Sequence, residues 1–179
     1  MKKHHSLFFL NIRSQLRTFY YICIMNVINE SGILAISTRL QRLADQIRKD
    51  GLLIYKANGI DFEPKWFPVI YTLHQKSILS VVEIAAEIGY SHPSTISLLK
   101  ELEKKKLIRS KKDKSDERKR LLTLTEKGTE LVTQMQPVWS VMTEALASFT
   151  TNLIKAIDEV EEKMEQQSFY QRAQSIKNK

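Results

Sequence analysis

The residues best suited to chemistry in this chain are lysines and arginines, and they are concentrated in one mid-chain block. Residues 100–120 contain eleven Lys and Arg against five Asp and Glu, whereas the flanking segments 61–99 and 126–179 are mildly acidic. A clustered basic surface is typical of proteins that bind the phosphates of nucleic acids. The alternative is a charge run that is merely solvated. The basic residues that we expect to contact phosphate are Lys100, Lys104, Lys111, Lys112, Arg118, Lys119 and Arg120.

A second group with binding chemistry lies at the start of a predicted helix, Ser91–Lys105. Ser91 is a favourable N-cap, and Pro93 falls in the first turn, where its missing N–H costs no hydrogen bond. Short polar side chains at this end reach base edges when such a helix enters the major groove, and the helix dipole favours nearby phosphate. The alternative for each is an ordinary solvent-exposed helix residue. The candidates for base contacts are His92, Ser94, Thr95 and Ser97, with Lys100 beyond them.

No pattern of residues indicates catalysis or metal binding. His74 and His92 lie apart, without a Cys or carboxylate cluster at ligand spacing, and His4 and His5 are terminal. There is no glycine-rich phosphate loop and no nucleophile motif. The single cysteine, Cys23, excludes an intramolecular disulfide and favours the cytoplasm. We therefore expect no enzyme activity, no metal and no cofactor.

The elements that must position these side chains follow the order helix, turn, helix, strand, loop, strand. Val81–Ile88 has helical spacing of apolar residues, and Gly89–Ser91 interrupts it before the helix Ser91–Lys105 begins. After this helix the period changes, which predicts two short strands, Leu107–Lys112 and Lys119–Thr125, around a charged loop. The basic block therefore falls on the second helix of a helix-turn-helix and on the β-hairpin after it.

Helical periodicity dominates both flanks of this central segment. Helices are predicted over about Glu30–Ala57 and from about Glu63 to His74, and a third covers the C-terminal part, where Pro137 should bend it. The polar tail after Gln171 is expected to fray. Heptad-like apolar stripes at both ends favour packing of the terminal helices on one another across two chains, with an intramolecular bundle as the alternative.

Residues 1–28 differ from the rest of the chain. Their apolar stretches are too short for a membrane span and lack the features of a signal peptide. Three interpretations remain: a helix that packs on a dimer, a basic amphipathic surface segment, or a wrongly assigned start, with Met25 as the candidate. The expected organisation is an atypical extension over 1–28, a dimerisation helix over 29–60, a DNA-binding domain over 61–128, and C-terminal dimerisation helices over 129–179.

The central segment resembles the MarR family (multiple antibiotic resistance regulators), and the resemblance covers about Glu30 to Gln171. The helix-turn-helix part rests on Ile84–Ser91, Ser94–Ser97 and Leu102–Ile108. More specific is the pattern Asp116-x-Arg118-x-x-x-Leu122-x-Leu124-Thr125-x-x-Gly128, which matches the family's wing signature at every signature position. One departure is Lys106, where the family usually has glycine.

The resemblance implies a mainly α fold with a small β-hairpin wing, a winged helix-turn-helix with N- and C-terminal dimerisation helices. It implies an obligate homodimer, a recognition helix from Ser91 and a wing from Lys111 to Arg120. Arg118 would reach into the minor groove, whose negative potential attracts arginine, and Asp116 would orient it. It also implies that Leu122 and Leu124 form the hairpin core, that Thr125 caps the next helix, and that Gly128 permits close packing.

Many members of this family release DNA when a small apolar or phenolic molecule enters a cleft beside the winged domain. Aromatic or amphipathic residues of this chain are suited to such a site, and the alternative is that each of them belongs to the hydrophobic core. Some relatives sense oxidants through a cysteine of the first helix, but Cys23 precedes that helix among apolar neighbours that blunt its reactivity. The effector-site candidates are Tyr55, Trp66, Phe67, Tyr71 and His74.

Together these observations predict a sequence-specific transcriptional regulator of the cytoplasm, a ligand-responsive repressor that binds a pseudo-palindromic operator in double-stranded DNA as a homodimer. The alternative is a winged-helix adaptor that binds proteins without reading DNA sequence. A membrane-associated protein that uses residues 1–28 is a third hypothesis, although no stable membrane insertion is expected.

Overall fold

The computed structural model describes residues 26–113, 116 and 119–178. The predictions for residues 1–25, including Cys23 and the alternative start at Met25, and for Arg118 lie outside this part of the chain. The chain divides within helix α3 into two compact units, which meet in sequence between Gly51 and Leu52.

The first unit contains α2 (Asn26–Glu30), the 3₁₀ turn η1 (Gly32–Ala35) and most of α3 (Ile36–Ala57). The sequence predicted one helix from Glu30, but Gly32 has a φ of +58°, and this left-handed residue separates two helical segments. Ala35 is buried, whereas Ile33 and Leu34 are 81% and 88% exposed. The segment directly before α3 therefore presents apolar side chains at its surface.

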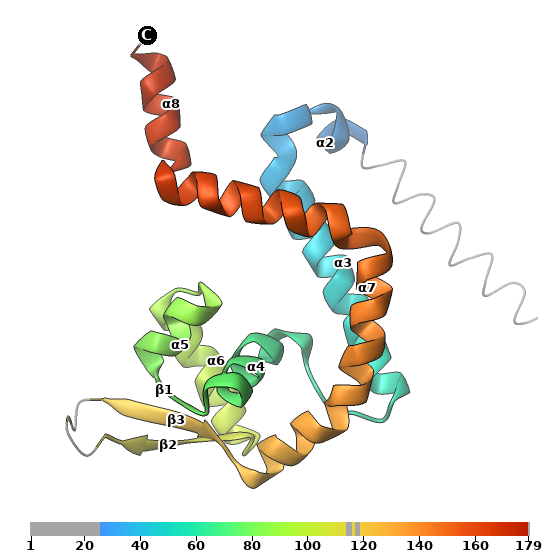
Figure 1. Ribbon diagram of the computed structural model, residues 1–179, viewed down its shortest axis with the longest axis vertical. Coiled ribbons are helices and arrows are strands. Elements are labelled where there is room, and N and C mark those ends of the chain that lie inside the picture. Colours follow the sequence, from blue (N-terminus) through green and yellow to red (C-terminus); the bar gives the residue numbers. More distant parts are fainter. Residues whose placement is uncertain (1–25, 114–115, 117–118, 179) are drawn as a thin grey trace, which may run out of the picture. The chain divides into compact units, whose positions relative to one another are not determined.

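The second unit contains the predicted winged helix and two C-terminal helices (Figure 1). The element bounds are η2 (Pro64–Trp66), α4 (Phe67–Lys76), β1 (Ile78–Ser80), α5 (Val81–Ile88), α6 (His92–Lys104), β2 (Ile108–Lys112), β3 (Arg120–Leu124), α7 (Glu126–Gln166) and α8 (Phe169–Lys177). The predicted fold class, mainly α with a small β wing, is confirmed.

The wing is part of a three-stranded antiparallel sheet with the order β1-β3-β2. The hairpin register pairs Ile108 with Leu124 and Lys112 with Arg120, as two strands around a loop require. The sequence missed β1, in which Leu79 pairs with Leu122. Three residues are too few to show a strand period, and their pairing partner lies more than forty positions away.

The helix boundaries of the helix-turn-helix follow from capping residues. The Ser80 side chain accepts a hydrogen bond from the Glu83 N–H, and Glu83 accepts one from the Ser80 N–H, so α5 begins with a complete capping box. Gly89 ends α5 in the left-handed conformation at φ +67°. Ser91 then caps α6 by accepting from the Ser94 N–H, as predicted.

One hydrophobic core joins α6 to β3, α5, η2 and α7. Leu102 of α6, Leu122 of β3 and Ile84 of α5 are fully buried, together with Trp66 and Met135. Because the second helix, the wing and the flanking helices share this core, the winged helix packs as one body.

The C-terminal part of the chain forms two helices. Helix α7 continues through Pro137 and is curved along its length (Figure 1). The prediction that the tail after Gln171 frays is wrong, because α8 begins with a capping box between Ser168 and Gln171. In the described ranges, no helix is long and apolar enough to cross a membrane.

Candidate nucleic-acid interface

Helix α6 has one buried face and one polar face. Leu98, Leu99 and Leu102 are buried, which fixes the rotation of the helix on the core. Ser97, Lys100 and Lys104 recur at spacings of three and four residues, so they share a stripe on the opposite side, and all three are exposed. Three of the predicted DNA-contacting residues of this helix, Ser97, Lys100 and Lys104, therefore lie on one accessible surface.

The structure contradicts the prediction that Thr95 contacts DNA. Thr95 is 0% exposed, and its hydroxyl donates to the carbonyl of Ser91 at 3.0 Å. The sequence contained the signal for this, because Leu98, Leu99 and Leu102 follow Thr95 at the helical spacings +3, +4 and +7. The sequence predicts a polar side chain that contacts bases at this position, but Thr95 packs as a core residue whose hydroxyl is bonded within its own helix turn.

The other polar residues at the start of α6 stay accessible. His92 and Ser94 are exposed, and the hydroxyl of Ser91 donates to that of Ser94 at 2.8 Å. The Ser94 hydroxyl keeps its own hydrogen to donate, because it serves as the acceptor in that bond. These side chains border the N-terminal end of the helix, where backbone N–H groups favour anions.

The wing carries further lysines of the basic block. Lys111 and Lys112 on β2 and Lys119 before β3 are exposed. The hairpin is closed by backbone hydrogen bonds from the Asp113 N–H to the Lys119 carbonyl (3.0 Å) and from the Lys119 N–H to the Asp116 carbonyl (2.9 Å). These bonds hold the lysines at the edge of a defined hairpin.

Arg120 has a structural partner that the sequence did not reveal. Its Nη2 lies 2.9 Å from Glu103 Oε1 and also donates to the Ser110 hydroxyl. Its guanidinium joins the base of the wing to α6, and the phosphate contact of Arg120 stays a prediction. This pair could not be predicted from the sequence, because it forms only when the hairpin folds beside the helix.

A groove of about 690 Å³ lies between the recognition helix and the wing. His92 and Lys119 both line it, with Val82 and Ile96 as apolar parts of its wall. Glu83 also lines it, but the Ser80 side chain and backbone bond this carboxylate and hold its pKa below the usual value. This carboxylate therefore serves as part of the cap of α5.

Two of the five effector-site candidates belong to the core. Tyr55 and Trp66 are almost completely buried, and each packs edge-on against Phe62. The Tyr55 hydroxyl accepts from Trp139 Nε1 at 2.8 Å, and burial raises the pKa of this phenol. For these two residues the structure supports the alternative stated above, hydrophobic core.

The other candidates lie on an exposed stripe of α4. Phe67 and Tyr71 stack with ring centroids 5.1 Å apart, and His74 follows one turn later and is exposed. Both rings also meet Trp139 of α7 edge-on, at 5.4 and 5.7 Å. We call Phe67, Tyr71 and Trp139 the aromatic cluster. The sequence analysis missed Trp139, because nothing local to α7 indicates that it faces α4.

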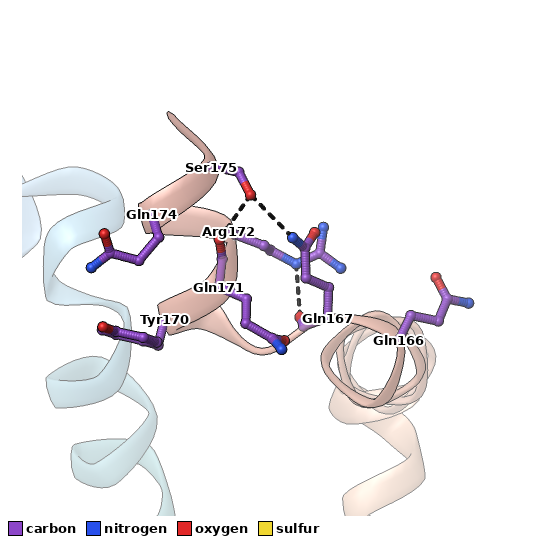
Figure 2. Close-up of a pocket in the computed structure, with 7 residues that line it drawn as sticks. All are labelled: Gln166, Gln167, Tyr170, Gln171, Arg172, Gln174 and Ser175. Carbon is purple, nitrogen blue, oxygen red and sulfur yellow. Dashed lines mark hydrogen bonds between the residues drawn. The ribbon is translucent and has the colours of Figure 1, made fainter. Parts of the chain in front are cut away.

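A second hollow, of about 700 Å³, lies at the junction of α7 and α8, remote in sequence from the basic block (Figure 2). Its wall is mostly glutamine side chains with Tyr170, and Arg172 donates to the Gln167 carbonyl at 3.0 Å and to that of Lys163. These bonds satisfy carbonyls at the end of α7, so Arg172 acts as a C-terminal cap.

Comparison with known proteins identifies the winged helix. Residues 60–119 match the model of the MarR family. No curated protein matches the chain in sequence. The resemblance drawn from the helix-turn-helix and wing residues is therefore confirmed for this segment.

Solved structures show the same fold at low sequence identity. A complex of MepR from S. aureus with DNA has a TM-score of 0.59 at 22% identity, covering 73% of this chain and 96% of that chain. A mutant MarR from E. coli with operator DNA gives 0.56 at 17%, covering 74% and 97%. The PcaV transcriptional regulator from Streptomyces coelicolor with its natural ligand gives 0.56 at 16%, covering 74% and 96%.

Proposed function

We propose that this chain, whose residues 60–119 match the MarR family, is a transcriptional regulator that reads duplex DNA with α6 and the wing. The observation that carries the proposal is the exposed stripe of Ser97, Lys100 and Lys104 on the recognition helix, accompanied by Lys111 and Lys112 on the wing. A helix that buries one apolar face and presents short polar and cationic side chains on the other is suited to the major groove.

In the mechanism that we propose, Ser94 and Ser97 contact base edges while the lysines hold phosphates. The groove between α6 and the wing, lined by His92 and Lys119, is suited to a sugar-phosphate strand running between the two elements. By its resemblance to the family, Arg118 at the wing reaches the minor groove. Base contacts then give specificity, and the lysines give affinity that depends on salt.

The regulator acts as a homodimer in this proposal. Apolar side chains are exposed in each unit, Ile33 and Leu34 in the first, Phe169 and Ile176 in the second. Clusters of exposed apolar residues of this kind mark interaction surfaces. Two recognition helices about one helical turn apart would then read a pseudo-palindromic operator. Light scattering during size-exclusion chromatography should give twice the 20.8 kDa of the chain.

We also propose that the regulator is a repressor released by a small apolar or phenolic effector. The aromatic cluster supports this part, because Phe67 and Tyr71 are both about 40% exposed although they are large aromatic residues. Such a ligand acts only if it binds the DNA-free arrangement of the winged domains more tightly than the DNA-bound one.

The experiment compares binding to duplex DNA from upstream of the chain's own coding sequence with binding to a scrambled duplex of equal length. Ser97→Ala should weaken only the specific complex, because a base contact carries sequence information. Lys111→Gln should weaken both complexes and lower the salt slope by about one, because it removes one phosphate contact.

Lys155→Gln provides the matched control, since it removes the same charge from an exposed position on α7. This variant should leave both complexes within about twofold of the parent. Absence of binding to either duplex at low salt would refute the proposal and favour the protein-binding adaptor.

A further inference from the structure

Two carboxylates border the buried face of α6, on opposite sides. With 3.6 residues per turn, Glu101 lies on one side of the Leu98–Leu102 face and Glu103 on the other. Glu103 bonds Arg120 of the wing, as described above. The partners of Glu101 lie in η2, the segment that leads into α4.

Glu101 is bonded to two neighbouring residues of η2. Its Oε1 lies 3.0 Å from Trp66 Nε1 and 2.8 Å from Lys65 Nζ. Trp66 is only 1% exposed, so a water molecule cannot readily replace this acceptor for its indole N–H. The Lys65 hydrogen bond lowers the pKa of Glu101.

The end of α6 is attached to the same segment by a second side chain. Nζ of Lys105, the C-cap residue, lies 5.4 Å from the centre of the Trp66 ring and 3.4 Å from Asp61 Oδ2. Trp66 is directly followed by Phe67, the first residue of α4 and a member of the aromatic cluster. The contacts thus connect the aromatic cluster to the last turns of the recognition helix.

The charge of Glu101 is unfavourable for a helix that approaches phosphates. By helix geometry Glu101 lies next to the stripe of Ser97 and Lys104, where a negative charge repels DNA. A neutral residue would serve DNA affinity better, unless this carboxylate has another task.

We propose that Glu101 is a positioning residue for DNA reading: its bonds to Trp66 and Lys65 fix the orientation of α6 relative to the start of α4. The inference rests on the proposed DNA-binding function and adds to it the residue that sets the angle of the recognition helix. It also provides a direct route by which a change at Phe67 reaches the bases, through Trp66 and Glu101.

The test uses Glu101→Gln in the full chain, with Glu87→Gln as the matched control. Both variants remove one negative charge, and Glu87 pairs with Lys76 at the exposed surface of α5. Glu101→Gln keeps an acceptor oxygen but removes the charge that strengthens both bonds, so it should lose roughly tenfold in affinity for the upstream duplex, while the scrambled duplex binds as well as before or better. Glu87→Gln should leave the preference between the two duplexes unchanged.

A second variant separates positioning from simple stability. Trp66→Phe removes the indole donor while it keeps an aromatic ring in the core. If the two residues act through one bond, the double variant loses no more specificity than the single variant with the larger loss. Melting temperatures of the variants do not follow their specificity ratios. Additive losses in the double variant would overturn the inference.

Failure of this inference is distinguishable from failure of the proposed function. If the unmodified protein prefers the upstream duplex and Glu101→Gln keeps that preference, only the role of Glu101 is refuted. If the unmodified protein shows no preference, the DNA-reading function itself is refuted.

Discussion

Lys106 is held in the left-handed backbone conformation at the junction of α6 and β2. Its φ is +60°, a region in which a Cβ costs roughly 1–2 kcal/mol and which glycine adopts freely. The MarR resemblance places glycine at this position, and the backbone geometry explains why. Lys106→Gly should therefore stabilise the fold relative to Lys106→Ala, because alanine keeps the Cβ and removes only the rest of the side chain.

The expected difference follows from the contacts of this residue. The Lys106 N–H donates to the Glu103 carbonyl at 2.9 Å, and its own carbonyl accepts from the Thr125 hydroxyl at 2.7 Å. Both bonds use backbone atoms of Lys106, so both variants keep them. The relief of strain is partly offset by the greater entropy of glycine in the unfolded chain, about 0.5–1 kcal/mol. The glycine variant should be more stable than the alanine variant by about 1 kcal/mol.

The assay is urea unfolding at one fixed protein concentration, followed by tryptophan fluorescence. Lys105 provides an internal control, because its φ is −74° and glycine has no advantage there. At Lys105 the order should reverse, with the alanine variant more stable than the glycine variant. If Lys106→Gly is no more stable than Lys106→Ala, the argument from backbone strain is refuted.

Two further predictions concern the same folded unit. Gly128→Ala should destabilise the fold by roughly 1–3 kcal/mol in the urea assay, since its Cβ would lie 2.1 Å from the Leu107 carbonyl oxygen; an unchanged midpoint would contradict this packing. Ser80→Ala should cost about 1 kcal/mol by removing the capping box of α5, and Ser80→Asn should restore most of it. A loss that asparagine does not restore would show that the serine acts through something other than capping.

The parts of the fold that the sequence predicted are those determined by neighbouring residues. The Ser91 cap, the Gly89 stop and the apolar spacing of Val81–Ile88 are local signals, so α5, its turn and α6 could be read directly. The resemblance to the MarR family also predicted the roles of Thr125 and Gly128: the Thr125 hydroxyl accepts from the Gly128 N–H at 3.0 Å, and no side chain fits at Gly128.

The missed features are contacts between distant parts of the chain. Strand β1 is specified by pairing with β3, and Glu101 meets Trp66 across 35 positions. Trp139 joins the aromatic cluster because α7 returns to α4, which no periodicity within α7 indicates. Polar residue type was also misleading at Thr95, where burial on the core stripe outweighs the preference of a hydroxyl for solvent.

The most direct test of the central claim is the affinity of the unmodified protein for its upstream duplex, measured over a series of salt concentrations beside the scrambled duplex. The account predicts tighter binding to the upstream duplex, and affinities that fall steeply as salt rises, because lysines of α6 and the wing displace counterions from phosphates. Equal affinity for both duplexes, or an affinity that does not change with salt, would contradict the assignment of this surface as a sequence reader.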